Sequence, residues 1–170
     1  MKKGPRSKDL SPFSIGDTMV YRVGTALLQH FQASEFKLPD KMDALFLLFL
    51  DAVRDRAGMG FVLNSDARSP EHNAQVGGVV TSLHLFDPLN DLVKARAVDF
   101  SIEEFKNHVV PWTTFAKIAE AVISVSHEQN VSYELEFQYG AVNKHVHLGL
   151  FREREHPSHL VVKGDAGVPA

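Results

Sequence analysis

A chain of 170 residues, 44% apolar and 23% charged, has the length and composition of one folded domain, which excludes a disordered polypeptide. Its net charge of −3 gives no electrostatic basis for binding nucleic acid, and the lack of cysteine excludes disulfides and thiolate metal sites. No apolar run is long enough to span a bilayer, so no membrane segment is expected.

Hydrophobic periodicity predicts the elements of the first half of the chain. Between Met42 and Ala57 the apolar residues recur at helical spacing, and Gly58 is suited to end that helix. The polar residues 1–12 are expected to be a flexible N-terminus. The other elements expected here are a short helix near residues 25–31, a buried strand at 60–65 and a short helix at 71–76.

The second half of the chain predicts a strand, a long helix and a terminal hairpin. Residues 85–94 are expected to form a loop before a strand at 96–101. Pro111 suits the first turn of a helix whose apolar stripe runs from Phe115 to Ile123, and Trp112 is expected in the core. Two strands that alternate apolar and polar residues are then expected to pair as a hairpin, at residues 133–138 and 144–151.

Together these elements predict an α+β fold, in which two main helices pack on a small, mostly antiparallel sheet. The domain is expected to span residues 13–152, and residues 153–170 are expected to be a C-terminal tail that frays. One face of the sheet would carry the apolar residues of the hairpin, and the polar residues would leave the other face open.

Several of these polar residues form a candidate set of metal ligands. His145 and His147 lie two residues apart on one strand, so both rings point to the polar face. His84 and Asp99 add an imidazole and a carboxylate from other segments. Two imidazoles and a carboxylate with an open fourth position are typical of hydrolytic zinc sites. The residues therefore predict a divalent metal site on the open face of the sheet, with a spare imidazole beside it.

The motifs around these residues resemble those of one enzyme family. In chain order they are Asn64-Ser65-Asp66-Ala67-Arg68-Ser69-Pro70-Glu71-His72-Asn73-Ala74-Gln75-Val76-Gly77-Gly78, Ser82-x-His84, Ala97-x-Asp99 and His145-x-His147. This order is similar to that of the zinc D-alanyl-D-alanine carboxypeptidases and related peptidoglycan peptidases, whose fold is shared by the hedgehog signalling domain. Ala33-Ser34-Glu35-Phe36 also resembles a segment of phage and bacterial members. The resemblance covers most of the chain, about residues 31–151.

The resemblance assigns roles around the metal. It implies that the zinc ligands are His84, Asp99 and His147. It also implies that His145 is a second active-site histidine, which lies near the metal without binding it. We therefore expect Zn²⁺ as the cofactor, held by nitrogen and oxygen ligands only.

The resemblance also implies residues that act on the substrate. Arg68 corresponds to an arginine that contacts carboxylate or carbonyl groups, and Ser82 to a serine near the bound substrate. The family's catalytic acid, usually a glutamate on the penultimate strand, is Glu136 or Glu134, which strand alternation places on the same face. Glu136 is favoured because it is nearer to the hairpin turn and to His145.

The sequence departs from the family pattern in the segment that joins two of the expected ligands. Asp99 follows His84 by fifteen residues, which is eight more than in the family's Ser-x-His-x-x-Gly-x-Ala-x-Asp motif. Ala95 stands at the position of the glycine, and Lys144 stands where an aromatic residue is common. A longer loop can reshape a cleft without moving its ends, so these departures bear on the substrate more than on the metal.

The resemblance implies a zinc-dependent peptidase acting on a peptidoglycan stem peptide or another peptide that contains D-Ala-D-Ala. The bond is either a terminal D-alanyl-D-alanine bond or an internal bond such as L-alanyl-D-glutamate. The main alternative is a zinc-containing, non-catalytic binding module or phage structural module of the same fold. A metal-dependent oxygenase is a third reading, but its His-x-Asp ligands normally lie close together, unlike His84 and Asp99.

The start of the sequence bears on where the protein acts. Residues 1–6 are basic, but no apolar segment of a signal peptide follows them. We therefore expect synthesis in the cytoplasm without a signal peptide. The expected site of action is the cell wall after release, as for a phage lysis enzyme, or a phage particle, or the cytoplasm for a dipeptidase. The sequence makes no prediction of oligomeric state.

Overall fold

The computed structural model describes residues 13–15, 18–107, 112–140, 144–151 and 157–163. The expectations for residues 1–12 and for Pro111 concern residues outside these ranges. In chain order the strands and α-helices are β1 (Phe13–Ile15), β2 (Thr18–Val23), β3 (Ala26–Leu28), α1 (Ala44–Ala57), β4 (Val62–Ser65), α2 (Pro70–Gln75), β5 (Ala97–Ser101), α3 (Trp112–Gln129), β6 (Ser132–Tyr139), β7 (Lys144–Phe151) and β8 (His159–Lys163). Short 3-10 helices lie at Ala33–Glu35, Pro39–Lys41 and Glu103–Asn107.

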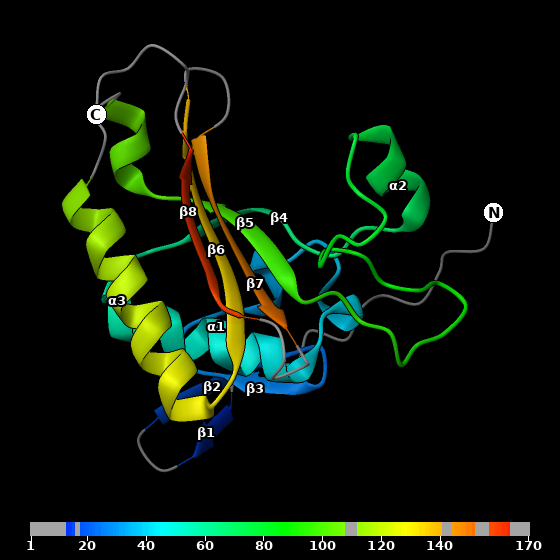
Figure 1. The fold of residues 1–170 in the computed structure, drawn as a ribbon. Coiled ribbons are helices and arrows are strands. Elements are labelled where there is room, and N and C mark those ends of the chain that lie inside the picture. The colour runs from blue at the N-terminus through cyan, green and yellow to red at the C-terminus, as the bar shows by residue number, and fades with distance from the viewer. Residues whose placement is uncertain (1–12, 16–17, 108–111, 141–143, 152–156, 164–170) are drawn as a thin grey trace.

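A five-stranded sheet with the order β4-β5-β7-β6-β8 forms the centre of the fold, and β1, β2 and β3 form a second, small antiparallel sheet. All pairs in the larger sheet are antiparallel except β6 with β8. Figure 1 shows α3 on one side of this sheet and α2 with the loop after it on the other. The predicted α+β fold, with two main helices and a mostly antiparallel sheet, is confirmed.

The two main helices cover the apolar face of the sheet. Phe46 and Leu50 of α1 and Ile118 of α3 are buried, and they share one core with Leu135 and Leu148 of the sheet. α1 begins where the Asp43 side chain accepts hydrogen bonds from two backbone N–H groups of the first turn. It ends at Gly58, whose left-handed φ of 63° is the expected glycine C-cap.

The β6–β7 hairpin has the predicted arrangement. Alternate residues of β6 are buried, and β7 follows the same rule through Val146 and Leu148. The ring of Phe137 stacks on that of Phe115 of α3 with centroids 4.3 Å apart. Because side chains of a strand alternate between its faces, this burial turns the remaining polar residues to the face that the helices leave open.

Three expectations about local structure are wrong. The segment expected as a helix near residues 25–31 contains β3, because the turn at Gly24, with φ of +55°, folds it back as a partner of β2. β4 was expected to be buried, but it lies at the edge of the sheet, and Val62 is 65% exposed. Trp112 was expected in the core, but it is 52% exposed and meets Phe115 edge to face.

Part of the expected tail is a strand of the main sheet. β8 pairs in parallel with β6, so that Glu136 lies opposite Val161 in the register and Gln138 lies opposite Lys163. The expectation of a fraying tail fails for this strand, because Leu160, Val161 and Val162 form a short β-type run that periodicity over five residues did not reveal. Among the described residues, no helix has the length and apolarity needed to cross a membrane.

Candidate metal centre

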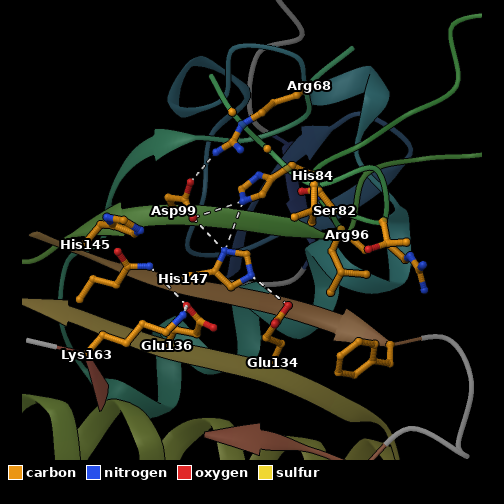
Figure 2. A pocket seen from close by; sticks show the side chains of 17 residues that line it. Arg68, Ser82, His84, Arg96, Asp99, Glu134, Glu136, His145, His147 and Lys163 are labelled. Carbon is orange, nitrogen blue, oxygen red and sulfur yellow. Dashed lines mark hydrogen bonds and ion pairs between the residues drawn. The ribbon is translucent and has the colours of Figure 1, made fainter. Parts of the chain in front are cut away.

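Three of the predicted site residues meet at one point on the open face of the sheet (Figure 2). Asp99 of β5 and His147 of β7 are opposite each other in the register, and His84 comes from the loop after α2. Asp99 Oδ1 lies 2.8 Å from His147 Nδ1 and 3.2 Å from His84 Nε2, and the two ring nitrogens are 3.3 Å apart. Residues separated by up to 63 positions thus present three ligand atoms to one point.

These distances fit a metal ion. Ligand atoms that bind a tetrahedral zinc ion at about 2.1 Å lie about 3.4 Å from one another. The three donor atoms all lie within 4.8 Å of one another, and those of Asp99, His84 and His147 are already at or below the tetrahedral separation. Nitrogen and oxygen donors of this kind suit zinc, so the site could hold the ion through small outward movements of the side chains.

Each of the three donors is oriented by a further group. His84 Nδ1 lies 2.7 Å from the backbone oxygen of Asp66, so the ring donates that proton and turns its other nitrogen to the site. Arg68 Nη2 donates to Asp99 Oδ2 at 2.6 Å, which leaves Oδ1 for the site. His147 Nε2 lies 3.3 Å from Glu134 Oε2. Partners of this kind fix the ring tautomers and orientations of metal ligands in proteins.

The loop that carries His84 is tied to the rest of the fold by its backbone. Arg68 N–H donates to the carbonyl oxygen of His84 at 2.7 Å, and Arg96 N–H donates to that of Leu83 at 2.7 Å. His84 itself is only 3% exposed. The Asp66 carboxylate is also buried, and it accepts hydrogen bonds from two backbone N–H groups at residues 37 and 38. This ligand is therefore held in place although it comes from a loop.

The charges of the centre favour a cation. Burial opposes ionisation of Asp99, but hydrogen bonds from His147 and His84 hold its pKa well below the usual range. Burial also opposes protonation of His147, but its bonds to Asp99 and Glu134 raise its pKa to about 9. The bond from His147 likewise lowers the pKa of Glu134. Two ionised carboxylates thus surround a position that binds a proton at neutral pH, and a metal ion would replace that proton.

All eight predicted site residues line one cleft, which has a volume of about 1090 Å³. His145 is half-buried there, and burial lowers its pKa, which favours the neutral ring. Ser82 Oγ accepts a hydrogen bond from the backbone N–H of His84 at 3.3 Å. Figure 2 shows Ser82 and Glu134 on one side of His147, and His145 on the other.

The structure separates the two glutamates that alternation could not. Glu134 contacts the metal-ligand candidate His147 directly. Glu136 instead accepts hydrogen bonds from Lys163 Nζ at 2.6 Å and from Gln138 Nε2 at 3.3 Å. Arg68 also differs from its expected role at the substrate, because it forms an ion pair with Asp99 at the wall of the cleft.

Sequence reasoning did not identify three further residues of this cleft. Ser65 Oγ accepts hydrogen bonds from Arg68 Nε and Nη2 at 2.9 and 2.8 Å and so orients the guanidinium group. Lys163 was missed because it lies in the expected tail, although it lines the cleft. Arg96 also lines the cleft, and its place two residues before Ala97-x-Asp99 ends was the available signal.

Comparison with known proteins gives one match. A family model described as Peptidase M15 matches residues 29–149, which is more than half of the chain and includes the three donors of the centre. No curated protein and no solved structure matches the chain.

Proposed function

Because this chain belongs to the peptidase M15 family, whose members are zinc peptidases, we propose that it hydrolyses peptidoglycan stem peptides with a zinc ion held by His84, Asp99 and His147. The observation that carries the proposal is the convergence of these donors, each with an orienting partner, in a large open cleft. The bond is the terminal D-alanyl-D-alanine bond or an internal L-alanyl-D-glutamate bond. The cleft, open along the sheet, supports an extended peptide as the ligand.

A zinc ion in this centre would supply Lewis acidity and a bound water with a pKa near neutrality. The chain's own residues then have to bind the peptide, accept a proton and pass it to the leaving amine. We assign the proton transfer to Glu136, because both of its hydrogen bonds within the described residues use Oε2 and Oε1 faces the cleft without one. Lys163 fixes the orientation of this carboxylate.

We assign Glu134 a positioning role. Its carboxylate accepts the Nε2 proton of His147, which leaves Nδ1 as the ligand atom and keeps the ring in one orientation. The neutral ring of His145 lies on the other side of His147 and is suited to donate a hydrogen bond to the carbonyl oxygen of the substrate.

Arg68 and Ser82 are proposed to contact the substrate from the walls of the cleft. Arg68 is held by Asp99 and Ser65 through Nε and Nη2, which leaves Nη1 for a carbonyl or carboxylate oxygen. Ser82 Oγ accepts a hydrogen bond from the His84 backbone and can donate its own proton to a peptide oxygen. Together the two residues would hold the peptide beside the metal centre.

Digestion of purified peptidoglycan by the zinc-loaded protein tests the proposal. Mass spectrometry of the products should show free D-alanine or stem-peptide fragments, and their masses identify the bond. The His147→Ala variant should release neither. His127→Ala is the matched control, because His127 is exposed on α3 away from the cleft, and it should retain full release.

The same experiment separates the alternatives. Zinc bound without any product would favour a non-catalytic binding module or a phage structural module. Failure of the wild-type protein to bind zinc would overturn the site itself. Product released equally by the wild type and by His147→Ala would overturn the assignment of the ligands.

A further inference from the structure

A side pocket of about 190 Å³ opens next to the cleft. Four residues line both the cleft and this pocket, among them Ser82 and Arg96, so the two hollows share a wall beside the metal centre. At about 30 Å³ per water molecule, this volume holds on the order of six waters, which is the space of one amino-acid side chain. A peptide bound in the cleft could therefore place one side chain in the pocket.

The long loop between His84 and Asp99 builds the far wall of the side pocket. Leu85, Val93 and Lys94 of this loop line the pocket. The loop is closed on itself, because the Asp87 N–H donates to the carbonyl oxygen of Val93 at 3.1 Å and that of Val93 donates to the carbonyl oxygen of Asn90 at 2.9 Å. These bonds give the wall a defined shape.

The two ends of the loop are also anchored in the fold. The Phe86 N–H donates to the carbonyl oxygen of Arg68 at 3.2 Å, and the Ala95 N–H donates to that of Lys41 at 2.9 Å. The ring of Phe86 is buried. The segment that departs from the family spacing therefore forms a fixed wall for the pocket.

The lining of the pocket combines apolar surface with positive charge. Val80, Leu85 and Val93 supply the apolar surface. Of the two cations, Lys94 Nζ is bound to Asp91 Oδ1 at 2.7 Å and to the backbone oxygen of Asp40 at 2.8 Å. Arg96 is the cation that the pocket shares with the cleft.

The backbone at Arg96 is fixed on both sides. Its N–H donates to Leu83, and its carbonyl oxygen accepts from the Leu150 N–H at 2.9 Å. The guanidinium group therefore starts from a fixed point in the wall between the two hollows. An arginine placed in this way is suited to recognise a carboxylate, which it can bind with two parallel hydrogen bonds.

We propose that the side pocket is a substrate subsite that takes an acidic residue, with its aliphatic stem against Val80, Leu85 and Val93 and its carboxylate on Arg96. The proposal rests on the proposed peptidase function, because it needs a peptide in the cleft. It makes the peptide residue beside the cleaved bond a glutamate-like one. The long loop thereby sets substrate choice.

Two synthetic stem-type peptides, identical except that glutamate in one is glutamine in the other, test this subsite. The zinc-loaded wild type should prefer the glutamate peptide by about ten- to hundredfold in kcat/KM, because hydrogen bonds to a charged group contribute about 1.5–3 kcal/mol. In Arg96→Gln this ratio should fall to about one. Arg22→Gln removes an exposed arginine of β2 and should keep the wild-type ratio.

A second variant tests the pocket without removing the charge. Val93→Phe places a larger ring on the exposed loop wall, and it should raise KM for the glutamate peptide at unchanged zinc content. A wild type that hydrolyses both peptides equally, or a preference that survives in Arg96→Gln, would overturn the subsite and leave the peptidase proposal standing. Hydrolysis of neither peptide by the zinc-loaded protein, nor of purified peptidoglycan, would instead overturn the peptidase proposal.

Discussion

At the scale of single residues, the contacts of Glu134 and Glu136 give the two carboxylates different roles. Glu134 is bonded to His147, so Glu134→Gln should weaken zinc binding about 10- to 100-fold. Glu136 is bonded to Lys163 and Gln138. Glu136→Gln should therefore keep zinc affinity and lower kcat about 10²- to 10⁴-fold. Zinc titration by calorimetry and peptide kinetics on both variants measure this division, and the reverse pattern would exchange the two roles.

His147 also predicts how the pH controls zinc binding. Its pKa of about 9 in the metal-free fold lies above the ordinary value of 6.5. Zinc needs the neutral ring, so binding at neutral pH releases this proton, and the apparent affinity should rise about tenfold per pH unit up to about pH 9. Calorimetric titration in buffers of different ionisation enthalpy counts the proton. Binding without proton release at pH 7 would contradict the contacts assigned to His147.

The same shift affects the stability of the metal-free protein. A histidine whose pKa is raised by folding stabilises the fold while both states are protonated, below about pH 6.5. That contribution is lost as the pH rises through about 9. Urea unfolding of the chelated protein should therefore show His147→Gln losing less stability than the wild type between pH 6.5 and 9, and equal losses would show that the ring is not paired in solution.

At the scale of elements, the regular segments could be predicted from the sequence and their edges could not. α1 followed from its apolar spacing with Gly58 at its end, and the β6–β7 hairpin from its alternation. β3 and β8 are short strands whose pairing depends on distant partners, so local periodicity could not distinguish them from a helix or a tail.

The candidate site shows the same division. Motif order placed the three ligand candidates correctly on one point, because register and fold bring them together. The roles of the glutamates depended on side-chain contacts that strand alternation leaves equal. Lys163 lies outside the family match and reaches the cleft only because β8 joins the sheet. Contacts between strands that are distant in sequence were therefore the information that the chain alone lacked.

Asp51 joins α1 to the end of β3, and it predicts how strongly these elements depend on each other. Its carboxylate accepts hydrogen bonds from the N–H groups of Gln29 at 3.0 Å and His30 at 2.8 Å. Asp51→Ala should lower the free energy of unfolding by about 1–3 kcal/mol, because both donors lose a charged acceptor. Asp51→Asn keeps one acceptor and should lose less. Urea unfolding measures both, and equal stability of all three proteins would contradict this link.

At the scale of the whole molecule, the core and the metal centre are separate sources of stability. The core lies on the helix side of the sheet, and the donors lie on the open face. Chelation should therefore leave the protein folded but lower its Tm. At a thousandfold excess of zinc over Kd the metal contributes about 4 kcal/mol, and each kcal/mol moves Tm by about 2–4 °C in a chain of this size. Calorimetry should show a fall of about 10 °C, and complete unfolding by chelator would contradict this separation.

The central claim is that one metal ion at His84, Asp99 and His147 makes this chain a peptidase, and stepwise return of zinc to chelated protein tests it most directly. The amount of peptide product released from purified peptidoglycan is measured at each addition. We expect no release from the chelated protein, release that grows with zinc and saturates near one equivalent per chain, and none at any zinc level from His147→Ala. Release that persists without metal, or none with the zinc bound, would contradict the account.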